Sequence, residues 1–148
     1  MFRPRSVLPQ SVQQLFLEKY GSVIFKNIEL ELKSFSPEII PEMQKENALV
    51  TEYDKLIASA QIEFEGETYT VAQMGPLQQD PDDKRRLAAW NAVGGWFAGK
   101  ADELDRIYDE LVALRNGMGE KLGFGGYTGL GYCRMMRNCY GQEEIERF

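Results

Sequence analysis

Apolar residues recur at helical spacing along most of the chain, and this pattern predicts a mainly helical protein. The first such segment places Val12, Leu15 and Phe16 on one side of a helix that Gly21 interrupts. Residues 1–10 contain two prolines and no periodic pattern. We therefore expect them to form a loose lead-in.

The next segment, residues 23–35, fits two patterns. Ile28, Leu30 and Leu32 alternate with polar residues as in a strand, whereas Ile24, Ile28 and Leu32 line one face of a helix. Residues 29–33 consist of Glu, Leu and Lys, which are all good helix formers. We therefore predict a helix.

A long helix is predicted from Ser36 to about Ala60. Ser36 suits the N-cap, Pro37 the first helical position, and Glu38 brings negative charge to the amino end of the helix dipole. The apolar stripe of this helix consists of Ile39, Met43, Val50, Tyr53, Ile57 and Ala60.

Two polar residues, Glu46 and Asn47, interrupt that stripe. Buried polar groups are normally hydrogen-bonded, so a polar residue on a core-facing stripe marks either a wet or hydrogen-bonded end or a cavity. Asn47 is accordingly a candidate substrate-binding residue that lines a cavity. The alternative is the wet or hydrogen-bonded end of the stripe.

Residues 61–71, QIEFEGETYTV, change to the period of two that is typical of strands. Glu65-Gly66 stands between the two apolar halves, and glycine permits the positive φ that a tight hairpin needs. We predict a two-stranded hairpin. Because an isolated hairpin is marginally stable, it must pack against helices or join a sheet supplied from elsewhere.

Another helix is predicted to begin at Asp80, which we assign as its N-cap. Its apolar face would carry Leu87, Trp90, Gly94 and Phe97, with Trp96 beside it. Gly94, Gly95 and Gly99 each cost about 1 kcal/mol relative to alanine inside a helix. Close packing against a neighbouring element is the simplest explanation for them.

A further helix is predicted from about Lys100 to Leu122, ending at Gly123. Asp102 and Arg106 are spaced as an i,i+4 ion pair. Its buried stripe is expected to contain Leu104, Ile107, Leu111, Leu114, Met118 and Leu122. No repeat or linker divides the sequence, so we predict a single helical domain over residues 1–148.

Residues 117–140 join a glycine-rich turn to a segment rich in arginine and tyrosine. The candidate substrate-binding residues here are Tyr132, Arg134, Arg137 and Tyr140. If residues 130–136 are helical, the two arginines share one face, and guanidinium groups can clamp a carboxylate. The alternative is an internal ion pair with an acidic neighbour.

The composition restricts the chemistry further. The 148 residues contain no histidine and two cysteines, so the chain offers no imidazole-based dyad and no closed zinc site; we predict no catalytic and no metal-binding residue. A net charge of -6 argues against nucleic-acid and anionic-membrane partners. No apolar run approaches the roughly 18 residues of a membrane span, and we expect a cytoplasmic protein with reduced thiols.

One apparent motif fails on inspection. Residues 94–101, GGWFAGKA, match the phosphate-loop pattern except that Ala101 replaces the Ser or Thr that would hold magnesium. The motif also lies within a helical pattern rather than after a strand. We therefore expect no nucleotide to bind there.

Three sequence runs together resemble one known family. They are ENALVTEY (46–53), ASAQIEFEGE (58–67) and LGYCRMMRNCY (130–140). Over roughly residues 19–148 the chain resembles oligoendopeptidase F and its relatives in the thimet oligopeptidase family. The resemblance implies a mostly helical zinc metallopeptidase that encloses a deep channel and cleaves short peptides, with zinc on a His-Glu-x-x-His motif and a further Glu.

The sequence departs from that family in its metal site. Because it contains no histidine, no zinc ligand or catalytic base of the family can be assigned to any residue here. The resemblance therefore implies an incomplete member that lacks the His-Glu-x-x-His region, needs no cofactor of its own and contributes channel wall. The alternative is a stand-alone, non-catalytic binding module that forms homo-oligomers through Trp90, Trp96, Phe97 and the hairpin edge.

Overall fold

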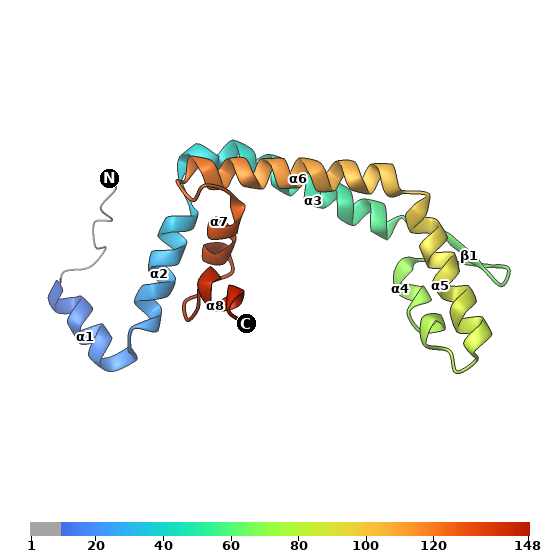
Figure 1. Cartoon of the computed structure of the whole chain (residues 1–148), viewed down its shortest axis with the longest axis horizontal. Coiled ribbons are helices and arrows are strands. Elements are labelled where there is room, and N and C mark those ends of the chain that lie inside the picture. The colour runs from blue at the N-terminus through green and yellow to red at the C-terminus, as the bar shows by residue number, and fades with distance from the viewer. Residues whose placement is uncertain (1–9) are drawn as a thin grey trace. The chain divides into compact units, whose positions relative to one another are not determined.

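The structure, a computed structural model, describes residues 10–148. The predicted lead-in lies outside these residues except for Gln10, which begins the first helix (Figure 1). In chain order the elements are α1 (Gln10–Tyr20), α2 (Val23–Ser34), η1 (Pro37–Ile39), α3 (Ile40–Ala58), β1 (Ile62–Phe64), β2 (Glu67–Tyr69), α4 (Val71–Met74), η2 (Leu77–Gln79), α5 (Asp83–Ala98), α6 (Ala101–Lys121), α7 (Tyr127–Arg134) and α8 (Gln142–Glu146). The prediction of a mainly helical fold with one hairpin is confirmed.

The chain divides into two compact units. Unit 1 consists of Met1–Met43 and Leu114–Phe148, and unit 2 of Gln44–Ala113. Helices α3 and α6 each contribute residues to both units. The single domain over residues 1–148 stays a prediction.

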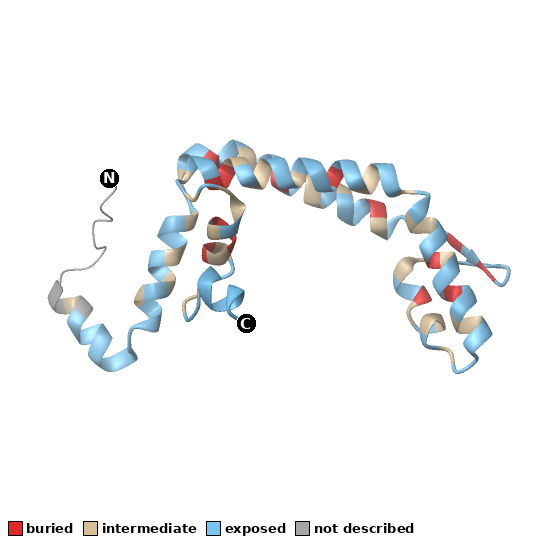
Figure 2. Cartoon of the chain, viewed as in Figure 1, coloured by how far each residue is buried: buried red, intermediate tan, exposed pale blue. Residues whose placement is uncertain are grey.

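Unit 2 is built around the hairpin. β1 and β2 pair antiparallel with Ile62 opposite Tyr69, and Glu65 and Gly66 form the turn with φ values of 52° and 85°. Positive φ at both turn residues matches the right-handed twist of the strands. The core contains Ile62, Phe64, Met74, Ala89 and Val93, so the hairpin packs against α4 and α5 as expected (Figure 2).

The hairpin is shorter than predicted at its second end. Thr70 and Val71 leave the strand, because the Thr70 hydroxyl accepts a hydrogen bond from the Gln73 backbone N–H and the Gln73 side chain accepts one from the Thr70 N–H. This capping box starts α4 at Val71.

The N-cap of α5 is Asp82, and the assignment of Asp80 to that role is wrong. Asp82 Oδ1 accepts hydrogen bonds from the backbone N–H groups of Lys84 and Arg85, at 2.8 and 3.2 Å. Asp80 instead accepts the Asp82 N–H at 2.9 Å. Two aspartates two residues apart both suit a helix start, and the loop from η2 decides which one caps.

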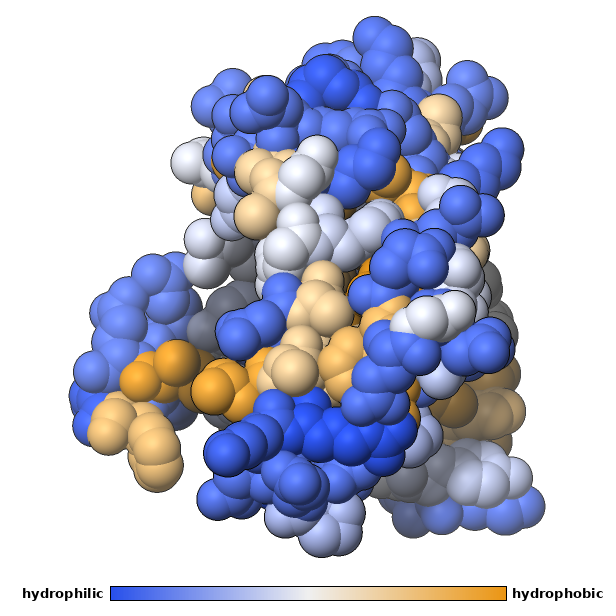
Figure 3. Space-filling view, turned by 90° about the vertical axis from the view of Figure 1, so that its right-hand side faces the viewer, coloured by the Kyte–Doolittle hydropathy of each residue, from blue (hydrophilic) through white to orange (hydrophobic). Residues whose placement is uncertain are grey.

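The buried face of α5 also differs from the prediction. Ala89 and Val93 are buried, whereas Leu87 and Trp90 are 62% and 57% exposed. Both sets of residues have helical spacing, and the smaller side chains lie against the hairpin. Hydrophobic side chains therefore reach the surface between hydrophilic ones, as the space-filling view shows (Figure 3).

Close packing does not explain the two glycines in α5 or the glycine that caps its C-terminal end. A Cβ atom built on Gly94 or Gly95 would meet no neighbouring atom within 4 Å. One on Gly99 would meet only carbonyl oxygens of its own helix, at 3.5 Å. The prediction of close packing against a neighbouring element is therefore wrong at all three positions.

The core of unit 1 lies where α6 and α7 meet η1. Ile39, Met118 and Leu130 are fully buried, with Met43, Leu122, Phe124 and Tyr127 packed around them. In α6, Ile107 and Met118 are buried as predicted, and the helix ends before Gly123. The i,i+4 pair is not the predicted one, because Arg106 binds Glu110 at 2.8 Å and also Glu52.

Candidate functional site

The arginine- and tyrosine-rich segment begins in α7 and continues past its end. Helix α7 closes with a Schellman motif, in which the N–H groups of Met136 and Arg137 donate to the carbonyls of Cys133 and Tyr132. Met136 occupies the left-handed position with a φ of 54°. The premise of one helix over residues 130–136 is therefore wrong, and Arg134 and Arg137 do not share a helical face.

Arg137 and two of the predicted tyrosines form one cluster. The guanidinium carbon of Arg137 lies 4.4 Å from the ring centroid of Tyr132 and 5.4 Å from that of Tyr140. A cation within about 6 Å of an aromatic ring is attracted by the ring quadrupole. Within the described residues Arg137 has these two rings as partners and no ion pair. We call Tyr132, Arg137 and Tyr140 the Arg137 cluster.

The loop that carries this cluster is fixed to α2. Asn138 Nδ2 donates to Asn27 Oδ1 at 2.6 Å, and the exposed Cys139 thiol donates to Asn138 Oδ1 at 2.9 Å. Tyr140 is exposed and Tyr132 half-buried. The cluster is therefore accessible to a ligand while its backbone is held in place.

The other predicted site residues are not members of this cluster. Arg134 ends α7, is partly buried and is engaged in an interaction of its own. Asn47 is exposed on the part of α3 that belongs to unit 2, and its backbone carbonyl accepts the Thr51 hydroxyl at 2.8 Å. A cavity-lining role for Asn47 stays a prediction.

Glu46, next to Asn47 in α3, is a buried residue that was not predicted as part of a site. Glu46 is 7% exposed and is the buried charged residue of the described chain. Its position on the apolar stripe of α3 was the available signal. A buried carboxylate needs partners, and Glu46 has one.

Cys133 is the buried thiol of α7, and Cys139 is exposed; both are free, as expected. Burial raises the pKa of the Cys133 thiol, and the positive charge of Lys33 on α2 opposes this shift in part. Cys133 is therefore a packing residue, not a nucleophile.

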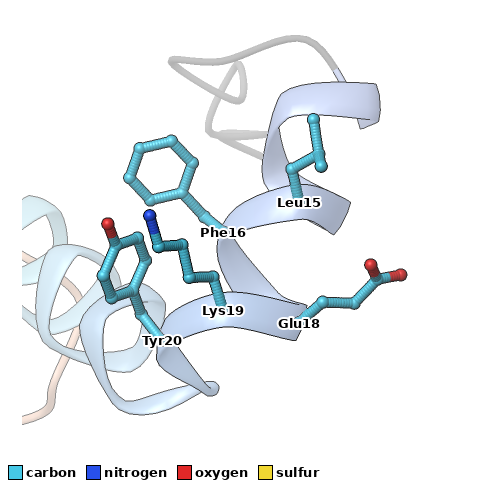
Figure 4. A pocket seen from close by; sticks show the side chains of 5 residues that line it. All are labelled: Leu15, Phe16, Glu18, Lys19 and Tyr20. Carbon is cyan, nitrogen blue, oxygen red and sulfur yellow. The ribbon is translucent and has the colours of Figure 1, made fainter.

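Helix α1 carries an open surface pocket of about 460 Å³, lined by Leu15, Phe16, Glu18, Lys19 and Tyr20. Phe16 and Tyr20 have ring centroids 5.4 Å apart, and Lys19 Nζ lies 5.2 Å from the Tyr20 centroid (Figure 4). The pocket combines apolar and aromatic side chains with one cation. It holds no set of groups for catalysis.

The described residues contain no group of three or more His, Cys, Asp or Glu side chains placed to hold a metal ion. They also include no helix that is both long and apolar enough to cross a membrane. The described residues therefore do not fit a zinc ion.

Nine-tenths or more of the chain matches solved peptidases. No protein-family model matches the sequence, and no curated protein does. A structure of PZ peptidase A with an inhibitor matches 90% of this chain at 40% identity and a TM-score of 0.83. A structure described as oligoendopeptidase F matches 93% of it at 39% identity and a TM-score of 0.85. The chain resembles part of an oligoendopeptidase F.

A third structure extends this likeness to a named organism. An oligoendopeptidase F from Bacillus anthracis str. Ames matches 93% of this chain at 38% identity and a TM-score of 0.83. The chain spans 24–25% of the length of these three proteins. The resemblance to oligoendopeptidase F is confirmed, and it concerns about a quarter of such a protein.

Proposed function

We propose that this chain is part of a zinc-dependent oligoendopeptidase that cleaves short peptides, and that it forms channel wall and not the metal site. The observation that carries the proposal is the match of at least 90% of the chain, at 38–40% identity, to a quarter of three peptidase structures. Fold alone does not establish activity, but identity at this level over nearly the whole chain supports a shared role.

The metal and the catalytic base would come from outside these residues. The chain contains no histidine, and its described residues do not fit zinc. The rest of such a peptidase would hold the zinc, which would supply Lewis-acid polarisation of the scissile carbonyl and the attacking water. The residues described here would hold and orient the peptide.

The Arg137 cluster is the part of the chain that we assign to peptide contact. Two tyrosine rings hold the guanidinium without neutralising it, since neither ring carries a charge. A guanidinium can accept a carboxylate through two parallel hydrogen bonds. The cluster would thus bind the carboxylate of a peptide, at its C-terminus or on an acidic side chain.

The test uses the isolated chain and a chimera. The chimera is the Bacillus anthracis oligoendopeptidase F in which this chain replaces the matching segment. The isolated chain should hydrolyse no peptide, whereas the chimera should cleave short peptides and lose this activity with a zinc chelator. Chelator-sensitive hydrolysis by the isolated chain would contradict the proposal, as would a folded chimera without activity.

Within that chimera, Arg137→Ala should raise KM for a peptide acid about three- to tenfold and leave kcat little changed, because it removes ground-state binding. For the corresponding peptide amide, which lacks the terminal carboxylate, Arg137→Ala should leave KM unchanged. Arg147→Ala is the matched control, since Arg147 pairs with Glu144 on α8. An equal rise in KM for both variants would assign the effect to net charge.

The dimerisation alternative rested on three aromatic residues and the hairpin edge. Trp96 and Phe97 pack against the unit 2 core, and their rings meet edge to face at 5.0 Å. Trp90 is exposed but donates its indole N–H to the Gln78 carbonyl at 3.2 Å. The structure thus leaves one of the three aromatics on the surface, and we keep the peptidase proposal.

A further inference from the structure

Helix α2 has apolar side chains that the described part of unit 1 leaves about half exposed. Ile24, Ile28, Leu32 and Phe35 are 42%, 38%, 52% and 51% exposed. The spacing of four residues places Ile24, Ile28 and Leu32 in one row along the helix, and Phe35 follows as its extended C-cap residue. We call these four residues the α2 row.

The opposite side of α2 is already occupied. Helix α7 packs along it, and Asn27 accepts the hydrogen bond from Asn138 there. The charge of Lys33 is close enough to influence the Cys133 thiol of α7. A helix with apolar residues on two sides is typically covered on both, so the α2 row lacks a partner of its own.

Helix α1 also carries exposed apolar residues. Leu15, Phe16, Leu17 and Tyr20 are all exposed, and three of them are among the residues that line the open pocket (Figure 4). Two consecutive helices thus present large hydrophobic side chains to solvent. Exposed large apolar residues in such number mark an interaction site.

We propose that the α2 row, with the apolar side chains of α1, is the docking surface for the part of an oligoendopeptidase fold that this chain does not span. The proposal rests on the function proposed above. The matched peptidases are about four times as long as the matched segment. About 10 residues of this chain lie outside two of the matches, fewer than the 12 residues of α2, so at least part of α2 recurs in proteins with ample chain to cover it.

A second copy of the chain suits this surface less well. Each copy carries a net charge of -6, so two copies repel each other. Glu29 and Lys33, beside the row, form an ion pair with each other at 2.7 Å. They are therefore not available for ion pairs with a second copy. The occupant we commit to is therefore a peptidase segment.

The experiment mixes the 148-residue chain with the Bacillus anthracis oligoendopeptidase F from which the matching segment has been deleted. Sedimentation velocity should show a one-to-one complex. Ile28→Glu with Leu32→Glu should weaken this complex at least tenfold, because two charges would enter an apolar interface. Lys26→Glu, on an exposed position outside the row, changes the charge by as much and should leave binding unchanged.

Three results would overturn the proposal. The chain could associate with itself in a way that the double variant abolishes, or the double variant could bind the partner as well as the control does. The third result is that a folded partner forms no complex with the chain. Because a deleted partner can fail to fold, the second measurement uses the covalent chimera. There the double variant should lower Tm by roughly 5 °C or more, and in the isolated chain it should lower Tm far less.

Equal shifts of Tm in the chimera and in the isolated chain would show that nothing covers the row. Binding and Tm are independent of catalysis. A complex or chimera that docks but cleaves no peptide would therefore contradict the proposed function and leave the docking surface standing.

Discussion

Two glycines in α6, only two residues apart, have opposite surroundings. A Cβ atom on Gly119 would lie 1.9 Å from the carbonyl oxygen of Gly126, which has a φ of 144°. A Cβ atom on Gly117 would meet nothing within 4 Å. The glycine-rich turn therefore packs directly against the backbone of α6 at Gly119, where there is no room for a Cβ atom. It makes no such approach at Gly117.

We expect Gly119→Ala to destabilise the protein by about 2–3 kcal/mol, because backbone and not a movable side chain must give way. Gly117→Ala is the matched control and should stabilise by up to about 1 kcal/mol, the helix-propensity difference. Urea unfolding monitored by circular dichroism measures both changes. Similar effects of the two substitutions would contradict the close approach.

The two thiols should also differ in reactivity. With a thiol-specific disulfide reagent at pH 8, Cys139 should react at once, whereas Cys133 should react only as the protein opens, because it is buried and its pKa is raised. Cys139→Ser should abolish the fast phase and Cys133→Ser should leave it. Two equally fast phases in the wild type would contradict the packing of α7 on α2.

At the scale of elements, Arg85 connects the hairpin to the start of α5. Its guanidinium binds Glu65 in the turn at 2.8 Å and Asp80 before the helix at 2.6 Å. The hydrogen bond to Arg85 lowers the pKa of Glu65. The pKa of Asp80 is lowered most by the hydrogen bond from the Asp82 backbone N–H and next by Arg85. These three residues join β1, β2 and α5 through charge.

These shifts set a pH dependence with a definite sign. Because both folded-state pKa values are lowered, the two carboxylates stabilise the fold above about pH 4, their unfolded values, and lose this effect as the pH falls further. Tm should therefore decrease on acidification below about pH 4. Arg85→Gln should lower Tm at pH 7 and reduce its dependence on pH.

The acid dependence should not disappear in Arg85→Gln, since the backbone N–H to Asp80 remains. Lys84→Gln removes the same charge from an exposed neighbouring position and should keep the wild-type pH profile. A profile that is unchanged in Arg85→Gln would show that the ion pairs with Glu65 and Asp80 are too screened by solvent to matter.

The helices and the hairpin could be predicted because their signals are local. Ser36 with Pro37, the Glu65-Gly66 turn and Gly123 each act on the backbone within a few residues. The burial of α5 could not be predicted in the same way. Its two apolar rows have equal periodicity, and contact with the hairpin selects the one with Ala89 and Val93.

The candidate site was predicted in composition but not in arrangement. Tyr132, Arg137 and Tyr140 do come together, yet through a helix end and not through a helical face. Nothing local marks Met136 for the left-handed conformation, which glycine or asparagine usually adopts. The helix end was therefore placed too late in the sequence.

At the scale of the whole molecule, the chain exposes more large hydrophobic side chains than its two small cores bury. The α2 row and the apolar residues of α1 account for many of them in unit 1, and Leu87 and Trp90 lie exposed in unit 2. A chain that spans about a quarter of its solved relatives would expose such surfaces.

The sequence by itself determined the helices, the hairpin turn and the absence of a histidine-based metal site, because backbone propensity and residue type act locally. Only the tertiary structure decided which face of α5 is buried, which aspartate caps it, where Gly119 meets Gly126 and how two tyrosines enclose Arg137. Each of these depends on contacts between residues distant in sequence or on the exact end of a helix. Periodicity cannot encode such contacts, because several faces of one helix can satisfy it equally well.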